Sequence, residues 1–310
     1  MASAAFVLFV AISHMFVSST MLILNKAVLA HLPVATTVLV LQVGFSAIIV
    51  WLLGKLGTIQ VSPFEASKAK TFFWNAVAFM ILLFSNAKAL QAANVEAVIV
   101  FRTLSLFVTA YGDFRLLKTR ILSFHMVGTL CLVLVGALGY VISDKGLEVH
   151  NFFWVLFYGC ANAAYPLVTQ VAIRSHKQMS SWDRAFYNNL MTLIVFLPGI
   201  FLLDEHKAIQ QLSARGQVTT FSLLLLLLSC VWGTAISFLG FLCLENLTAT
   251  TFNVMGNANK LLTLVLNSLI WDQHASLQAN VFLLTSLIGS AMYGEVRRRE
   301  CSSKSQRQST

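Results

Sequence analysis

The chain has 310 residues, of which 57% are hydrophobic and only 11% are charged, and its formal net charge is +9. A soluble domain carries about 25% charged residues, so this composition excludes a soluble globular protein and requires lipid to cover the apolar surface. The basic residues lie in short segments between apolar runs, which indicates membrane topology rather than a nucleic-acid-binding surface, and no nucleic-acid partner is predicted.

Apolar runs follow one another from the start of the chain to its basic tail. Each is about 19–25 residues long, the length that a helix needs to cross a hydrocarbon core about 30 Å thick. The predicted spans are residues 6–29, 34–53, 72–90, 95–117, 121–142, 151–173, 183–203, 218–242, 247–270 and 276–294. We therefore predict an all-α polytopic membrane protein with ten transmembrane helices in a lipid bilayer.

The lysines and arginines between these spans divide unequally between the two sides of the membrane. Three lie on one side, at Lys145, Lys207 and Arg215. Thirteen lie on the other side, at Lys55, Lys68, Lys70, Arg115, Lys118, Arg120, Arg174, Lys177, Arg297, Arg298, Arg299, Lys304 and Arg307. Because basic loops stay on the cytosolic side, both termini are predicted to be cytosolic.

The second half of the chain resembles the first in the order and hydropathy of its segments. The stretch that begins at Asn94 aligns with the one that begins at Asn246, and both close on Gly-x-x-x-Tyr, at residues 136–140 and 289–293. This predicts two five-helix repeats, 1–146 and 147–296, followed by a basic cytosolic tail at 297–310. An odd number of spans inverts the second repeat, which is typical of transporters with a midplane substrate site.

Two basic residues lie well inside predicted spans. Lys260 is at the centre of span nine and Arg102 is about a third of the way into span four. Each costs about 2.5–3.5 kcal/mol to insert, and only Asp113 is an acid well inside a span. A bound anion is therefore predicted to supply the counter-charge, whereas Lys26, Lys88 and Arg184 lie near helix ends, where their charges can reach the interface.

Polar residues recur at helical spacing around these two cations. Asn253, Asn257, Lys260 and Asn267 share one face of span nine, and Arg102, Ser105, Thr109 and Gly112 share one face of span four. Further polar residues lie in spans one, three and six, including His14, Asn75 and Tyr165. These stripes predict a polar cationic cavity suited to a nucleotide; the alternative is hydrogen bonding between helices.

Features of a membrane-embedded enzyme are not found in the sequence. Such an enzyme would need an Asp-x-Asp metal motif, paired intramembrane carboxylates or a histidine cluster. The seven histidines are scattered, and the five cysteines contain no Cys-x-x-Cys pair. We predict no enzymatic activity, no cofactor and no metal site.

Two short motifs resemble the signatures of GDP-mannose and related GDP-sugar transporters. This group is a branch of the nucleotide-sugar transporters within the drug/metabolite transporter superfamily. The first motif is Phe186, Tyr187, Asn188 and Asn189 in span seven, and the second is Gly256-x-x-Asn259-Lys260 in span nine. The Asn25-Lys26 pair and the run from Phe101 to Asp113 are also similar, so the resemblance extends over the whole chain.

The resemblance implies roles for these residues. The first motif would read guanine through its asparagines, and the second would hold the diphosphate and sugar, with Arg102 sharing the phosphate charge. The chain departs from the pattern at Asn257-Ala258, where the family has Ala-Leu, and at His14, Val98 and Phe252, where yeast-like members have tyrosines. His14, Asn257 and Phe252 are included in the predicted site, and the departures leave the sugar open between mannose, fucose and others.

The predicted function is antiport of a GDP-sugar against GMP, importing the sugar nucleotide into the Golgi lumen by alternating access. The alternatives are a carrier for another nucleotide-sugar and a sugar-phosphate/phosphate antiporter of plastid type. The sequence does not separate a Golgi membrane from an endoplasmic reticulum or plastid membrane. Small residues at Ser286, Ser290 and Gly294 favour helix packing, within the bundle or between the two copies of a homodimer.

Overall fold

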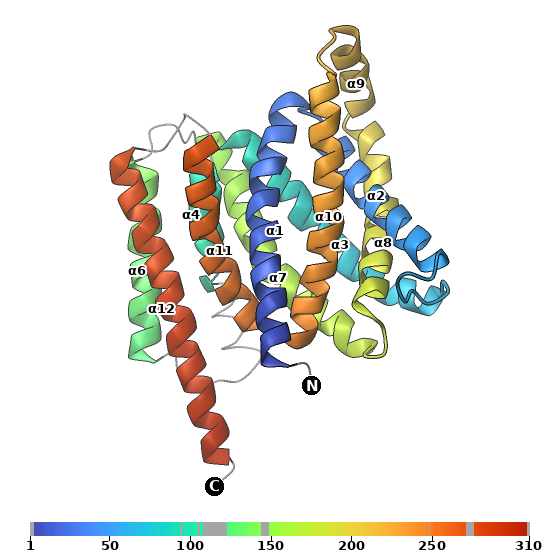
Figure 1. Ribbon diagram of the computed structural model, residues 1–310. Helices are drawn as coiled ribbons and strands as arrows, with labels where there is room; N and C mark the ends of the chain where they lie inside the picture. Colours follow the sequence, from blue (N-terminus) through green and yellow to red (C-terminus); the bar gives the residue numbers. More distant parts are fainter. Residues whose placement is uncertain are drawn as a thin grey trace.

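The computed structural model describes residues 3–93, 95–104, 106–107, 123–143, 149–247, 249–270 and 276–308, and across these residues the chain is helical with no strand (Figure 1). The helices are α1 (Ala4–His31), α2 (Ala35–Lys55), α3 (Ala66–Ala92), α4 (Val95–Thr103), α6 (Phe124–Ser143), α7 (Val149–Ser175), α8 (Ser181–Leu202), α9 (Glu205–Ala214), α10 (Thr220–Asn246), α11 (Ala249–Ile270) and α12 (Leu277–Gln308).

Each predicted span overlaps a helix of the structure. In the predicted span 95–117, the structure describes the helix α4. Asp113 lies outside the described residues. Six helices in the described part of the chain, α1, α2, α3, α6, α8 and α10, are long and apolar enough to cross a membrane. Large hydrophobic side chains such as Phe9, Trp74 and Leu202 are exposed on the outside, where lipid would cover them. The protein is an all-α polytopic membrane protein; ten crossings and cytosolic termini stay predictions.

The short helix α9 was not predicted, because its sequence is polar and has no membrane-length apolar run. It follows Asp204, whose φ of 53° turns the chain sharply after α8. Glu205 at its start is buried, and its carboxylate accepts hydrogen bonds from the backbone N–H groups of Thr36 (3.0 Å) and Thr37 (2.7 Å). These N–H groups are at the N-terminus of α2, so α9 caps a helix far away in the sequence.

Helices from the two predicted halves pack against each other in a regular pattern. The first half contains, in order, α1, α2, α3, α4 and α6. The second half contains α7, α8, α10, α11 and α12. The second helices pack together (α2 on α8), and so do the fifth (α6 on α12). The first of each half packs on the third of the other, as α1 on α10 and α7 on α3. The pairing is unchanged when the halves are exchanged.

The α6–α12 contact depends on glycine. A Cβ atom at Gly136 would lie 2.5 Å from the backbone nitrogen of Ser286, and one at Gly289 would lie 2.9 Å from the backbone nitrogen of Val133. Ser286 and Ser290 are fully buried. This small-residue stripe therefore packs α12 within one chain and gives no support to the predicted homodimer. The helix continues without a break across residue 297, where the basic tail was predicted to begin.

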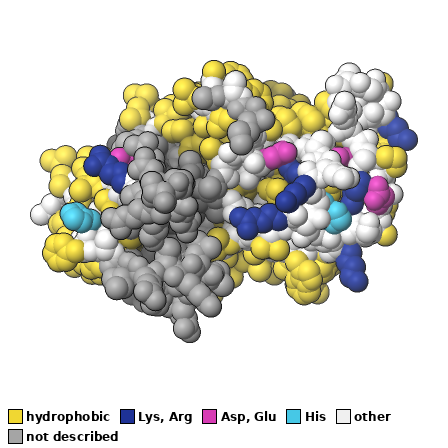
Figure 2. Space-filling view, turned by 90° about the horizontal axis from the view of Figure 1, so that it is seen from below, with side chains coloured by type: hydrophobic (Ala, Val, Ile, Leu, Met, Phe, Trp, Pro, Cys, Tyr) yellow, Lys and Arg dark blue, Asp and Glu magenta, His cyan; other side chains and the backbone are white. Residues whose placement is uncertain are grey.

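Both termini lie at one end of the molecule, which we call the terminal face (Figure 1). Figure 2 looks onto this face: lysines and arginines gather over the helix ends, and hydrophobic side chains form much of the rim. Arg184, predicted to reach the interface, is 1% exposed and pairs with Glu245 of α10 at 2.8 Å. The first turn of α8 accounts for this position, because Ser180 and Asp183 form a capping box that starts the helix there.

Lys26 is half-buried near the C-terminal end of α1. Its ammonium group donates hydrogen bonds to the carbonyl oxygens of Leu90 (2.6 Å) and Ala93 (3.0 Å), at the C-terminal end of α3. It also interacts electrostatically with Glu96, a 2% exposed acid in the first turn of α4. The sequence analysis missed Glu96 as a buried acid. Lys26 therefore joins α1 to the α3–α4 connection at the end opposite the terminal face.

Candidate functional site

A cavity lies between the helices of both halves. Its polar lining comprises His14, Ser18, Asn25, Gln42, Asn86, Arg102, Tyr158, Asn162, Tyr165, Asn189 and Ser237. Apolar lining is contributed by residues that include Met21, Phe79, Leu82, Phe241, Phe252 and Gly256. Among the described lining residues Arg102 has a permanent charge and none is an Asp or Glu. The cavity therefore favours an anion.

The cationic end of the cavity is built by α1, α4 and α11. Arg102 of α4 lies against Gly256 of α11, where a Cβ atom would be 3.6 Å from Nη2 of the arginine. A side chain at position 256 would narrow the space beside the guanidinium group. The His14 ring packs against Phe252 with centroids 5.1 Å apart, and its Nδ1 has no hydrogen-bond partner among the described residues. Three of the predicted site residues from these helices thus meet around Arg102.

Lys260 lies behind this end of the cavity. Its side chain is 2% exposed, and it is not among the lining residues, although it interacts electrostatically with Arg102. Asn259 is buried as well, and its backbone and side-chain oxygens both accept from the Ser19 hydroxyl of α1. Among the described residues of the second motif, Gly256 alone lines the cavity. The position of Asn257 is within α11, but its side chain is outside the described part of the structure.

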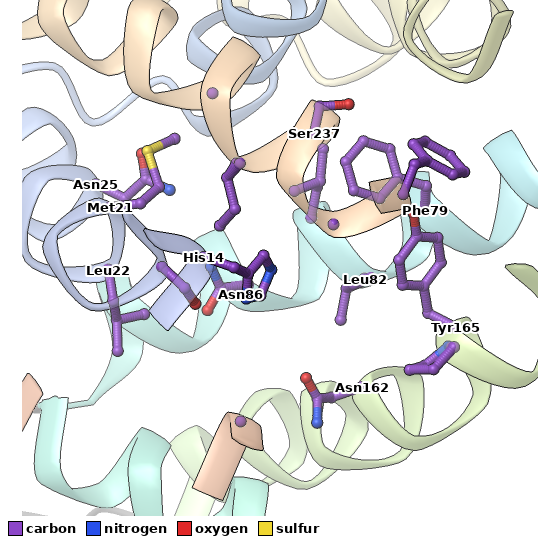
Figure 3. A pocket seen from close by; sticks show the side chains of 18 of the residues that line it. His14, Met21, Leu22, Asn25, Phe79, Leu82, Asn86, Asn162, Tyr165 and Ser237 are labelled. Carbon is purple, nitrogen blue, oxygen red and sulfur yellow. The ribbon is translucent and has the colours of Figure 1, made fainter. Parts of the chain in front are cut away.

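The opposite end of the cavity is aromatic. Figure 3 shows Ser237, Phe79 and Tyr165 toward one end and His14, Asn86 and Leu22 toward the other. The Phe79 and Tyr165 rings are 5.2 Å apart. Asn189 of α8 belongs to the Ser237 end, because its Nδ2 donates to Ser237 at 2.8 Å. A flat ring with polar edges suits this end, and phosphate suits the other.

The four residues of the first motif have different surroundings in the structure. Asn189 lines the cavity, whereas Asn188 is fully buried and its Oδ1 accepts from Asn75 of α3 at 2.7 Å. The Tyr187 hydroxyl accepts from the Glu65 backbone N–H at 2.7 Å and donates to the Pro63 carbonyl. Phe186 packs in a hydrophobic cluster. Successive helical residues point about 100° apart, so the four side chains reach four different neighbours.

The sequence analysis missed several polar residues of the cavity region. Gln42 of α2 donates to Asn25 (3.0 Å) and to Ser229 of α10 (2.9 Å), which joins three helices. Gln42 could have been found from the sequence, because it is a single glutamine in an apolar span and buried polar groups in a membrane need partners. Ser46 and Ser237 gave no comparable signal. Among the described residues no group of His, Cys, Asp and Glu is placed to hold a metal ion.

Comparison with known proteins shows that the chain is similar to named sugar-nucleotide transporters and to solved structures. The chain is 31% identical to GDP-fucose transporter 1 of Arabidopsis thaliana, over 91% of this chain and 83% of that protein. It is 30% identical to the GDP-mannose transporter GONST3 of the same plant, over 92% and 77%. GDP-mannose transporter 2 of Vanderwaltozyma polyspora is 22% identical, over 91% and 90%.

A crystal structure with 13% identity superposes on 96% of this chain and 99% of its own, with a TM-score of 0.63. At that identity the similarity shows a shared fold and nothing more. No protein-family model matches the sequence.

Proposed function

Since the chain belongs to the GDP-sugar branch of the nucleotide-sugar transporter family, we propose that it exchanges a GDP-linked sugar for GMP across the Golgi membrane. It is a transporter and not an enzyme. The observation that carries the proposal is the two-ended cavity, with Arg102 at one end and the Asn189 carboxamide beside aromatic rings at the other. A nucleotide has a charged end and a flat polar end in the same order.

In this proposal Arg102 and the ammonium group of Lys260 attract the diphosphate. Gly256 allows the phosphates to approach Arg102, because any side chain there would occupy the space next to the guanidinium group. Asn189 reads the base, and His14 and Phe252 lie on the sugar side. Phe186, Tyr187, Asn188 and Asn259 act by holding α8 and α11 in place. The named relatives include both fucose and mannose carriers, so the sugar stays open between these two.

We also propose that residues 1–146 and 147–296 are inverted repeats that rock about the cavity, with both termini in the cytosol. The symmetric helix pairing supports this. So do two contacts between α6 and α12, Gly136 with Ser286 and Val133 with Gly289. Both offsets are the same, since 289 − 136 and 286 − 133 each equal 153, so each contact becomes the other when the halves are exchanged.

The decisive experiment is a competition panel. The purified protein is reconstituted into vesicles loaded with GMP, and uptake of labelled GMP is measured against external GDP-mannose, GDP-fucose, UDP-galactose, CMP-sialic acid, triose phosphate and inorganic phosphate. We expect the GDP-sugars to compete and the others to compete poorly. Stronger competition by a UDP- or CMP-sugar would favour another nucleotide-sugar, and competition by triose phosphate with phosphate would favour the plastid-type alternative.

A further inference from the structure

Three basic residues come together where α3 begins and α7 ends, at the terminal face. The two helices pack against each other, and the Thr71 hydroxyl of α3 forms a hydrogen bond of 3.0 Å with the ring of His176, directly after α7. Lys70 precedes Thr71, Lys177 follows His176, and Arg174 is in the last turn of α7. All three therefore lie within a few residues of one contact, and we call them the seam cations.

The side chains of the seam cations are exposed, and none of them forms an ion pair with a residue that the structure describes. Two other basic residues of this face have acidic partners. Lys68 pairs with Glu65 at 2.7 Å, and Arg184 pairs with Glu245 at 2.8 Å. The positive-inside rule accounts for basic residues on one side of a membrane, but not for a close group without acids. Because like charges repel at this separation, a bound anion would stabilise the group.

Apolar side chains lie about one helical turn deeper on the outer surface of the same two helices. Trp74 is 71% exposed and follows Lys70 by four residues, so both lie on one face of α3. Val171 is 67% exposed and precedes Arg174 by three residues on α7. Tryptophan is enriched at the level of the lipid headgroups, and one turn is about 5.4 Å. This depth puts the seam cations near the lipid phosphates. Figure 2 shows basic side chains beside hydrophobic ones on this face.

We propose that the seam cations bind the headgroup of an anionic phospholipid, whose acyl chains lie against Trp74 and Val171. Arginine and lysine side chains donate charge-assisted hydrogen bonds to phosphate oxygens, and basic clusters at a membrane surface attract anionic lipids. The site is separate from the transport cavity, because none of these five residues lines it. The inference is therefore independent of the proposed function. Since α3 and α7 belong to the two predicted halves, one lipid would contact both.

The test measures lipid binding by the full chain in detergent. The purified protein is titrated with phosphatidylinositol or with phosphatidylcholine, and the bound lipid is counted by native mass spectrometry. We expect the wild type to bind phosphatidylinositol in preference to phosphatidylcholine. The double variant Lys70→Gln with Lys177→Gln should bind phosphatidylinositol about 30-fold more weakly, at about 5-fold for each basic residue. Its binding of phosphatidylcholine should not change, because that headgroup carries no net charge.

The matched control is Lys55→Gln with Arg299→Gln, which removes the same charge from exposed residues of α2 and α12. It should leave phosphatidylinositol binding unchanged. An equal loss in both double variants would overturn the inference, because it would show attraction by the net charge alone. Equal binding of the two lipids by the wild type would also overturn it. Glycerophosphoinositol, the same headgroup without acyl chains, should not displace the lipid; displacement would indicate a free-phosphate site instead.

Discussion

Asn188 and Asn189 are adjacent in the sequence, yet their surroundings predict different consequences of mutation. Asn189→Ala removes a carboxamide that lines the cavity, so we expect GMP affinity to fall about 10–150-fold, equivalent to about 1–3 kcal/mol. Asn188→Ala leaves the amide of Asn75 without its partner. It should lower the melting temperature in detergent and change GMP affinity much less. Both quantities can be measured on the same purified samples.

A selective loss of guanine over adenine binding in Asn189→Ala is part of this prediction. If both substitutions weaken GMP equally, the cavity-facing assignment of Asn189 is wrong. An equal loss for AMP and GMP would show that Asn189 holds some other part of the nucleotide.

Lys260 provides a second prediction at the residue scale. Lys260→Ala should abolish exchange while the protein stays folded, because the ammonium group adds to the positive potential around Arg102 at the phosphate end. Lys260→Arg should be poor too, since a wider planar group does not replace a compact ammonium. Lys88→Ala is the control: Lys88 lies over the Phe84 ring at 5.6 Å and is not a lining residue. Normal exchange by a folded Lys260→Ala variant would contradict the assignment.

At the scale of elements, the α6–α12 pair gives a prediction that does not depend on the substrate. Gly136→Ala would place a methyl group 2.5 Å from the Ser286 backbone nitrogen, and a backbone cannot yield as a side chain can. The two helices would have to separate, which we expect to destabilise the protein by about 1–3 kcal/mol. The melting temperature in detergent should fall accordingly.

Gly128 lies in the same helix and serves as the control. A Cβ atom there meets nothing within 4 Å, so Gly128→Ala should be neutral or stabilising by about 0.5–1 kcal/mol through its better helix propensity. If Gly136→Ala is as stable as Gly128→Ala, then the close approach of α6 and α12 is not present in solution.

The elements α8 and α11 each combine a binding face with anchoring faces. On α8, Asn189 faces the cavity while Tyr187 and Asp183 hold the connection between α2 and α3 through Pro63 and Ser62. On α11, Gly256 faces the cavity while Asn259 holds α1. A motif residue can therefore hold a helix of the site in place without lining the cavity itself.

For the whole molecule, the cavity charge predicts obligatory exchange. A GDP-sugar brings about two negative charges, and GMP carries about −1.5 to −2 because its second phosphate pKa is near 6. Either ligand neutralises the positive end. An empty carrier would have to close around the Arg102 guanidinium group in a poorly hydrated cavity, where the described lining residues include no acid. We expect this to slow the empty return by orders of magnitude.

The measurement is GDP-sugar uptake into vesicles with and without internal GMP. Uptake should require internal GMP or GDP-sugar and should respond little to a potassium diffusion potential. Arg102→Gln tests whether the guanidinium charge causes the requirement for exchange. This variant should bind GDP-sugar more weakly, and its remaining uptake should depend less on internal GMP. Rapid concentrative uptake into empty vesicles, driven by voltage or a proton gradient, would contradict obligatory exchange.

The sequence alone determined the helical membrane architecture. In a bilayer every backbone polar group must be satisfied within the chain, so an apolar run of sufficient length has to form a helix, and hydropathy is a local property. The expectation that Arg102 faces a polar cavity also came from the sequence, because a central cation is tolerated only where it faces polar surroundings. Polar α9, which has no such run, could not be predicted in this way.

Only the tertiary structure decided which residues of the motifs line the cavity. The partners of Asn189 are 143 and 48 residues away, and that of Asn259 is 240 residues away. Periodicity places a side chain on a helix face, but it does not say which neighbouring helix will offer a donor or an acceptor there. The neighbour depends on how distant helices pack. This packing places Asn189 at the cavity and Asn188 against α3, and it places Gly256 at the cavity and Asn259 against α1.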